Sequence, residues 1–298
     1  MNKFTSNDIS DLSGKTILIT GGNSGIGFQT ALVLAGKGAD VIIGCRSIKN
    51  AEKAIADIKY IYPNAKVSSV IFDLASLKSI QKFTDDWDIS KLDILINNAG
   101  VMNISKRTET LDGFEMQFGV NHLGHFALTL GLLPYIQKSQ NPRVVTVAST
   151  GAYAGKIDFN NLNSEKKYHR MGAYTASKLA NVMFANELAN RYPNILSVAV
   201  HPGAATTNLQ RHSGDDALMN SIGNFLMKLV GQSQADAALP SLYAATSPDI
   251  VTNKFYGPVE KFNKGGAGIV KTPKRAKNED VAKKLWDVSE KLIQNIID

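Results

Sequence analysis

Seven short apolar runs, six of them rich in valine and isoleucine, recur along the chain and alternate with segments of helical periodicity. The runs are KTILIT, ADVIIGC, KVSSVIFD, LDILIN, PRVVTVAS, NILSVAVHPG and NKFYG. Continuous apolar strands separated by helices are typical of a parallel sheet that is covered on both faces. The sequence therefore predicts an α/β fold with a doubly wound, mostly parallel seven-stranded sheet and helices on both faces.

The chain shows no internal boundary between residues 14 and 260, because no Pro/Gly/Ser-rich linker, compositional break or repeat occurs there. We therefore expect residues 1–298 to form one domain, with a helical tail near 279–296. Inserted segments near 155–171 and 208–235 follow strand ends, where ligands bind in open α/β sheets. We expect these two inserts to form the substrate side of a site.

Composition limits the classes of function. Cys45 is the single cysteine, which excludes an intramolecular disulfide and predicts a reducing, cytoplasmic location. Residues 1–15 lack a signal peptide, and no run approaches the roughly 18 apolar residues of a membrane span, so we expect no transmembrane segment.

Lysine and arginine exceed aspartate and glutamate, 33 against 26. The excess gathers near the C-terminus, where interleaved acidic residues favour a solvated helix face over a nucleic-acid contact.

A glycine-rich turn, TGGNSGIG, connects the first predicted strand to an apolar helix. Gly21, Gly25 and Gly27 would let the backbone turn sharply and approach a pyrophosphate at the helix N-terminus. The other loop positions expected at the cofactor are Asn23, Ser24 and Ile26. A P-loop is excluded, because Phe28 and Gln29 stand where lysine and Ser/Thr would follow the last glycine. The turn predicts nucleotide binding, with an ordinary helix-entry turn as the alternative.

The end of the second strand, IIGCRS, indicates which dinucleotide binds. In dinucleotide-binding folds an acidic residue at this point binds the ribose 2′-hydroxyl of NAD. Cys45 stands in that position, and Arg46 after it can make charge-assisted hydrogen bonds to a 2′-phosphate. The pattern predicts NADP(H), with a surface cation at a strand end as the alternative interpretation of Arg46.

Two Tyr-x-x-x-Lys pairs occur in the chain, and their sequence contexts differ. Tyr62 precedes Pro63, which disfavours a helix and keeps Tyr62 and Lys66 off a common face. Tyr174 and Lys178 begin YTASKLANVMFANELANR, a strong helix former, so their i, i+4 spacing places them on one helix face. A nearby ammonium favours phenolate, so we expect Lys178 to lower the pKa of Tyr174 toward working pH.

Ser149 ends the fifth strand in VVTVAST, at the sheet edge where this architecture assembles binding sites. Its hydroxyl is a candidate to hold a substrate oxygen while Tyr174 exchanges a proton with it. VASTG is also similar to a nucleophile elbow, but Val147 replaces the first glycine, which disfavours a serine hydrolase. His122 and His125 have the spacing of a metal pair, but no third ligand neighbours them, so we expect polar helix residues and no metal.

The glycine turn, Ser149, Tyr174 and Lys178 occur in the order seen in the short-chain dehydrogenase/reductase family, which the chain resembles over roughly residues 14–260. The resemblance implies a Rossmann-like fold. It also implies that Asn121, in GVNHLGHF, holds a water that links the lysine to solvent. A helix-interior or capping asparagine is the alternative.

The resemblance implies further cofactor contacts at later strand ends. These are Asp73 and Leu74 as an adenine-contacting pair, Asn98, Ala99 and Gly100 in the NNAG turn, Pro202 and Gly203 beside the nicotinamide, and Thr207, with Thr206 as the near alternative. Tyr174 and Lys178 are expected to contact the cofactor as well. Taken singly, such residues are more often turn formers, and their place in the series is what favours function.

The stretches DGFEMQFGVNHLGHF and IDFNNLNSEKKYHRMGAYTASKLANVMFANEL are similar to the retinol dehydrogenase-like branch of this family. Members of that branch often carry an N-terminal membrane anchor. Residues 1–15 do not resemble such an anchor, which argues against retinol itself as the substrate.

These patterns together predict an NADP(H)-dependent oxidoreductase that transfers a hydride between nicotinamide and a small apolar carbonyl or alcohol, with Tyr174 as general acid/base. Candidate pocket residues are Met102, Ile104, Tyr153 and Phe159. The alternative function is a regulator that binds NADPH without turnover. We expect no nucleic-acid partner, and the sequence leaves a homo-oligomer open.

Overall fold

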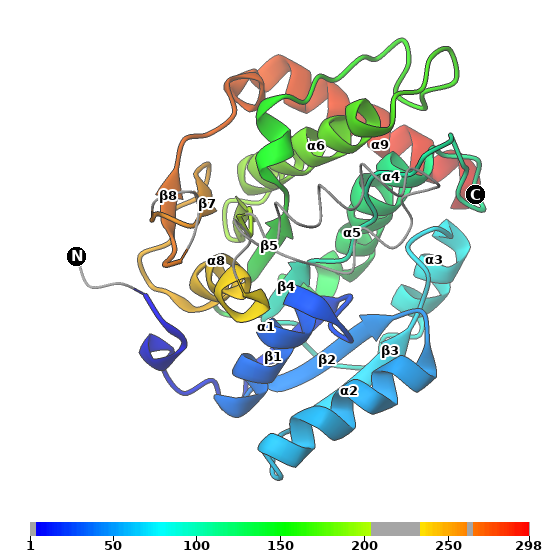
Figure 1. Cartoon of the computed structure of the whole chain (residues 1–298). Coiled ribbons are helices and arrows are strands. Elements are labelled where there is room, and N and C mark those ends of the chain that lie inside the picture. The colour runs from blue at the N-terminus through cyan, green and yellow to red at the C-terminus, as the bar shows by residue number, and fades with distance from the viewer. Residues whose placement is uncertain (1–3, 204–232, 261–264, 298) are drawn as a thin grey trace, which may run out of the picture.

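The computed structural model describes residues 4–203, 233–260 and 265–297, and Figure 1 shows the whole chain. Thr206, Thr207 and most of the predicted 208–235 insert lie outside the described residues. The strands are β1 (Thr16–Thr20), β2 (Asp40–Cys45), β3 (Val67–Ile71), β4 (Ile94–Asn97), β5 (Arg143–Val147), β6 (Leu196–Val200), β7 (Phe255–Gly257) and β8 (Gly268–Val270).

The strands form a single eight-stranded sheet in the order β3-β2-β1-β4-β5-β6-β7-β8. Neighbouring strands from β3 to β7 pair in parallel, and β8 pairs antiparallel with β7. The doubly wound, mostly parallel sheet is confirmed, and each of the seven predicted strands is present. The predicted strand number is short by one, because β8 is a three-residue edge strand, GIV, too short to show a period.

Helices cover both faces of the sheet, as predicted. The α-helices are α1 (Gly25–Gly36), α2 (Ile48–Ile61), α3 (Leu77–Asp85), α4 (Met116–Phe118), α5 (Gly124–Ile136), α6 (Arg170–Arg191), α8 (Gln234–Thr246) and α9 (Glu279–Ile297). Single turns of 3₁₀-helix are η1 (Ser6–Asp8), η3 (Thr150–Tyr153) and η5 (Lys274–Lys277). A π-helical turn, η2 (Gly119–Leu123), joins α4 to α5.

Strand residues alternate between two apolar cores, because successive side chains point to opposite faces of a sheet. Ile17 and Ile19 of β1 pack in the core under α1, α2 and α8, while Leu18 packs in the core under α3, α5, α6 and α9. All three side chains are fully buried. A sheet with both faces buried explains why the strands read as continuous apolar runs.

The C-terminal tail is helical, as predicted, and α9 packs against α6, α3 and α5. Its apolar face inserts Trp286, whose ring lies 5.7 Å from the Phe184 ring, stacked at 15°, and 4.8 Å from the Phe126 ring. No helix within residues 4–203, 233–260 and 265–297 is long and apolar enough to cross a membrane.

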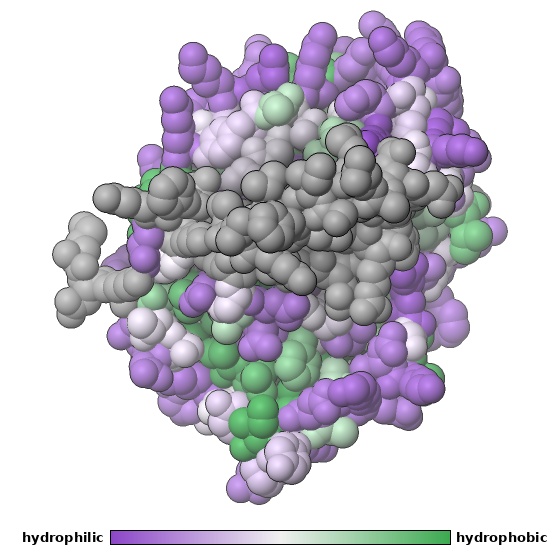
Figure 2. Space-filling model, in the orientation of Figure 1, coloured by the Kyte–Doolittle hydropathy of each residue, from purple (hydrophilic) through white to green (hydrophobic). Residues whose placement is uncertain are grey.

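The face of the molecule seen in Figure 2 is largely hydrophilic, with hydrophobic residues gathered over α1 and α2. On α2, Ile48, Tyr60 and Ile61 are exposed apolar side chains. The candidate site is built elsewhere, at the carboxyl ends of the central strands.

Candidate active site

The glycine turn connects the end of β1 to the start of α1. Gly21 and Gly25 have φ of +67° and +59°, a region that favours glycine. The Gly21 N–H donates to the Gly44 carbonyl of β2 at 2.7 Å, which anchors the turn to the sheet. Ser24, with extended backbone, precedes α1, and its side chain makes no capping hydrogen bond. The start of α1 therefore presents N–H groups suited to an anion.

Gly27 brings the start of α1 directly against the strand ends. A Cβ on this residue would collide with the Gly21 carbonyl and would lie 2.5 Å from Nδ2 of Asn98. A side chain would therefore fill the space between helix and turn. The bare, glycine-lined turn at an uncapped helix N-terminus fits the pyrophosphate of a dinucleotide.

Thr20 joins this turn to the NNAG segment after β4. Its hydroxyl accepts hydrogen bonds from the N–H groups of Asn98 and Ala99 at 2.8 and 2.9 Å. In return, Nδ2 of Asn98 donates to the Thr20 carbonyl at 2.8 Å. Sequence reasoning did not single out Thr20, although its place before the first glycine was the available signal.

The positions predicted to select NADP(H) lie at the end of β2. Cys45 is buried, which raises the pKa of its thiol, and its Sγ–H donates to the Ser47 carbonyl at 3.3 Å. Arg46 is exposed and has no ion-pair partner among the residues that the structure describes. Its guanidinium is therefore available to a phosphate.

Asp73 and Leu74 follow β3. Oδ1 of Asp73 accepts the Ala75 N–H at 3.0 Å, so this carboxylate forms the turn that leads to α3. Leu74 is buried in the core on the α3 side. The structure thus shows a turn-forming role for Asp73, and the adenine contact of the pair stays a prediction.

The structure brings Ser149 and Tyr174 together. Ser149 lies just after β5, where its Oγ accepts the Gly151 N–H at 3.1 Å, and Tyr174 lies in the second turn of α6. Burial raises the pKa of Tyr174, and a hydrogen bond with the Ser149 side chain lowers it. The net shift is upward, so the expected lowering by Lys178 is not seen and burial dominates.

Lys178 lies one helical turn after Tyr174 and is only 3% exposed. Burial lowers the pKa of its ammonium to about 8. Its Nζ donates to the Val147 carbonyl at 3.0 Å. Val147 is the last residue of β5 and lies one position past the final residue of β5 that pairs with β4. A Cβ on Gly100 would lie 3.4 Å from this Nζ, so the NNAG turn borders the lysine.

Asn121 is fully buried in the π-turn η2 and joins the NNAG turn to α6. Its Oδ1 accepts the Val101 N–H at 2.8 Å, and its Nδ2 donates to the Val101 carbonyl at 2.9 Å and to Oγ of Ser177 at 3.0 Å. A Cβ on Gly100 would lie 3.0 Å from Oδ1 of Asn121 and 3.4 Å from Nζ of Lys178, so both side chains border the NNAG turn. The role of Asn121 in holding a relay water stays a prediction.

Pro202 and Gly203 follow β6 at the same edge of the sheet. Gly203 has φ of +73°, and its N–H donates to Nδ1 of His201 at 3.2 Å. His201 is buried, which lowers its pKa to about 4, so the imidazole accepts this bond in its neutral form. Sequence reasoning passed over His201.

The remaining sequence patterns do not form sites. Tyr62 follows the last residue of α2 and Lys66 precedes β3, so this pair shares no helix. Nε2 of His122 pairs with Oγ of Ser289 at 2.9 Å, while His125 has different partners. Burial lowers the pKa of each imidazole to about 3. Within the described part of the chain, no group of His, Cys, Asp and Glu could hold a metal.

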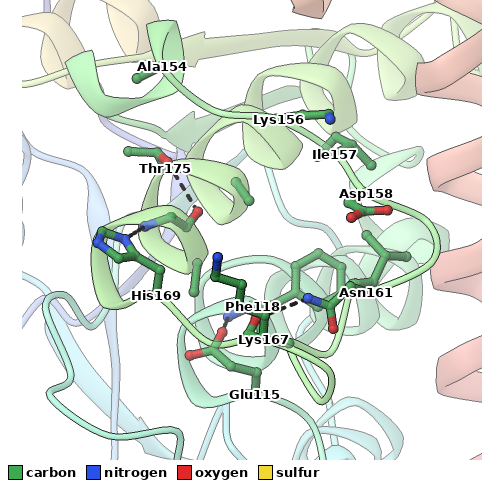
Figure 3. A pocket seen from close by; sticks show the side chains of 15 residues that line it. Glu115, Phe118, Ala154, Lys156, Ile157, Asp158, Asn161, Lys167, His169 and Thr175 are labelled. Atoms are coloured by element: carbon green, nitrogen blue, oxygen red, sulfur yellow. Dashed lines mark hydrogen bonds between the residues drawn. The ribbon is translucent and has the colours of Figure 1, made fainter.

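A surface hollow of about 270 Å³ lies between the 155–171 insert and the start of α6. Figure 3 shows His169 and Thr175 on one side of it and Asp158 and Asn161 on the other. Ser149, Tyr174 and Lys178 are not among the residues that line this hollow. The hollow is therefore separate from the Ser149, Tyr174 and Lys178 cluster.

Two of the candidate pocket residues are engaged elsewhere. The hydroxyl of Tyr153 donates to the Lys271 carbonyl at 2.6 Å, and Lys284 of α9 lies 4.4 Å above the ring of Phe159. Ile104 is buried, and its carbonyl accepts the Tyr168 hydroxyl at 2.7 Å. These contacts tie Tyr153, Phe159 and Ile104 to other segments of the chain, and their place in a substrate pocket stays a prediction.

The fold and this arrangement of residues agree with sequence comparison. The sequence profile described as short chain dehydrogenase matches residues 15–218. The chain belongs to the short-chain dehydrogenase family, whose members are oxidoreductases that bind a nicotinamide cofactor.

Within the family the chain is retinol dehydrogenase-like. It is 41% identical to human retinol dehydrogenase 13 over 95% of this chain and 85% of that protein. It is 40% identical to mouse retinol dehydrogenase 14 over 95% of this chain and 86% of that protein. A crystal structure of an uncharacterized protein from Mycobacterium Paratuberculosis matches with a TM-score of 0.81 and 35% identity over 98% of both chains.

Proposed function

We propose that this protein is an NADP(H)-dependent alcohol dehydrogenase or carbonyl reductase acting on a small apolar substrate. The observation that supports this best is the placement of Ser149 and Tyr174, which both border Gly151, together with the buried Lys178 one helical turn further on. The pair lies at the sheet edge that also carries the glycine turn. Proton exchange and cofactor binding would thus share one site.

The residues of the chain that would hold the cofactor form a continuous series. The glycine turn at Gly21, Gly25 and Gly27 would take the pyrophosphate, and Arg46 would bind a 2′-phosphate. When bound, the nicotinamide supplies or accepts the hydride. The NNAG turn, the Pro202–Gly203 turn and Lys178 border the place where the nicotinamide half would lie.

The proton would move at Tyr174. Its hydroxyl would give a proton to the substrate oxygen during reduction and take it back during oxidation, as a general acid/base. Ser149 would hold that oxygen, since its hydroxyl and the Tyr174 ring both border Gly151. Lys178 would bind the cofactor ribose.

The substrate class is inferred from relatives and from the branch motifs. Relatives named retinol dehydrogenase are 40–41% identical over 95% of the chain, which supports an apolar alcohol or aldehyde. We further propose that residues 1–298 act as one domain in the cytoplasm, without a nucleic-acid partner.

The test is the change in nicotinamide absorbance with NADPH or NADH against retinal, aromatic aldehydes, steroid ketones and quinones. Tyr174→Phe should keep NADPH affinity and lose turnover, because only the hydroxyl that carries the exchangeable proton is removed. Tyr256→Phe is the matched control, since its hydroxyl bonds Val251 and is remote from Ser149. A Tyr174→Phe protein that retains near wild-type turnover would refute the proposed role.

A further inference from the structure

His125 connects the two halves of the candidate site through both of its ring nitrogens. It lies in the first turn of α5 and is only 1% exposed. Its Nε2 is 2.8 Å from Oγ1 of Thr20, and its Nδ1 is 3.1 Å from the carbonyl oxygen of Asn121. Neither the predicted catalytic set nor the predicted cofactor contacts include this residue.

The partners of Thr20 fix the tautomer of His125. The Thr20 hydroxyl already accepts two N–H groups, from Asn98 and Ala99, and so uses both of its lone pairs. Its own proton must therefore be donated, and Nε2 of His125 is the nearer acceptor at 2.8 Å, against 3.4 Å for the Ile96 carbonyl. The imidazole proton then lies on Nδ1 and is donated to the Asn121 carbonyl.

The π-turn explains why the His125 side chain donates to the Asn121 carbonyl. In η2 the backbone hydrogen bonds are displaced by one residue, as the bond from Gly124 N–H to the Gly119 carbonyl shows. Such turns occur frequently at functional sites. The imidazole N–H of His125 supplies a donor to the Asn121 carbonyl, four residues earlier, inside this irregular turn.

Two sets of contacts meet at His125. On one side Thr20 holds the Asn98 and Ala99 amides of the cofactor turn. On the other side Asn121 holds Val101 and, through Ser177, the part of α6 next to Lys178. We propose that His125 is a positioning residue that locks the cofactor-binding NNAG turn to the π-turn carrying Asn121; this inference rests on the proposed function.

Three substitutions of His125 separate its two contacts, and a fourth variant is the control. His125→Phe removes both hydrogen bonds and keeps a ring in the core. His125→Gln keeps an acceptor that can reach Thr20, and His125→Asn keeps a donor near the Asn121 carbonyl. His122→Phe is the matched control, because His122 is equally buried three residues away but bonds to Ser289 of α9.

We expect His125→Phe to weaken NADPH binding about tenfold, the scale of one or two hydrogen bonds, and to lower turnover as well. His125→Gln should restore NADPH affinity better than turnover, and His125→Asn should do the reverse. His122→Phe should lower the stability of the fold and leave the NADPH Kd within about twofold of wild type. If the NADPH Kd values of the four variants change only in proportion to their free energies of unfolding, the proposal is overturned.

Amide hydrogen exchange in the free protein gives a readout that needs neither cofactor nor substrate. His125→Phe should speed exchange at Asn98 and Ala99 at least about tenfold, and His122→Phe should not, since only the first frees the Thr20 hydroxyl from its partner. Unchanged exchange at both amides in His125→Phe would overturn the positioning role. A wild-type protein that binds no NADPH would instead refute the proposed function, with the exchange result still deciding the role of His125.

Discussion

Lys178 should make the fold less stable at neutral pH than an uncharged residue would. Its ammonium is 3% exposed, has no carboxylate partner within the described residues, and is bonded to one acceptor, the Val147 carbonyl. Burial lowers its pKa from 10.5 to about 8. At 1.36 kcal/mol per pKa unit, this shift corresponds to a penalty on the order of 3 kcal/mol for the charged form.

Lys178→Met removes the charge and keeps an unbranched side chain. The lost hydrogen bond to Val147 offsets about 1 kcal/mol of the gain, so we expect the variant to be about 2 kcal/mol more stable at pH 7. Its turnover should be abolished, which would make Lys178 a site where function opposes stability.

The gain should depend on pH in a defined direction. Below pH 8 the lysine is protonated in both folded and unfolded protein, so the penalty is fully present. Between pH 8 and 10.5 the folded protein loses this proton while the unfolded chain keeps it, so wild-type stability rises toward that of the variant. The advantage of Lys178→Met should therefore shrink across that window.

Urea unfolding of both proteins at pH 7, 8, 9 and 10 measures the difference directly. Lys49→Met, at an exposed lysine of α2, is the control and should show no comparable gain at any pH. If Lys178→Met proves less stable than wild type at pH 7, or if its advantage does not change with pH, the reasoning is wrong.

Three further outcomes follow from the site. Gly27→Ala should lower the free energy of unfolding by about 1–3 kcal/mol and weaken NADPH binding, because its Cβ meets backbone and the half-buried side-chain amide of Asn98. Gly36→Ala, in the same helix, meets only the movable Tyr62 ring at 2.6 Å and should stay within about 1 kcal/mol of wild type in urea unfolding. Arg46→Ala should raise the Kd of NADPH at least tenfold more than that of NADH, about 1.4 kcal/mol of discrimination; equal losses in a fluorescence titration would count against the 2′-phosphate contact. Ser149→Ala should raise the pKa of Tyr174 further by removing the hydrogen bond that lowers it, shifting the alkaline limb of the pH–rate profile upward.

Strongly periodic elements could be predicted from the sequence, and irregular ones could not. The buried parallel strands β1, β2, β4, β5 and β6 are marked by runs of valine, leucine and isoleucine because both sheet faces are buried there. The Tyr174 helix was expected from propensity, but it begins at Arg170, since His169 caps it by accepting the Gly172 N–H through Nδ1. A histidine cap is not a common start signal.

Within the site, residues tied to chain order could be predicted, and roles set by tertiary contacts could not. The i, i+4 spacing was enough to place Tyr174 and Lys178 on one helix face. The direction of the Tyr174 pKa depends on how deeply the fold buries the hydroxyl, which spacing does not report. The π-turn adds one residue of irregularity to a helical pattern. The hydrogen bonds of His125 to Thr20, 105 positions earlier, and to Asn121, four positions earlier, therefore could not be predicted from the sequence.

The packing of α9 bears on the order in which the protein can be completed during synthesis. Trp286 packs on Phe126 of α5 and Phe184 of α6. The side of α6 that faces α9 is therefore covered only by residues synthesised roughly one hundred positions later. At about 5–20 residues per second, a ribosome needs roughly 5–20 s to add them. During that interval α6 presents an uncovered aromatic surface, and this is when a chaperone would have most to bind.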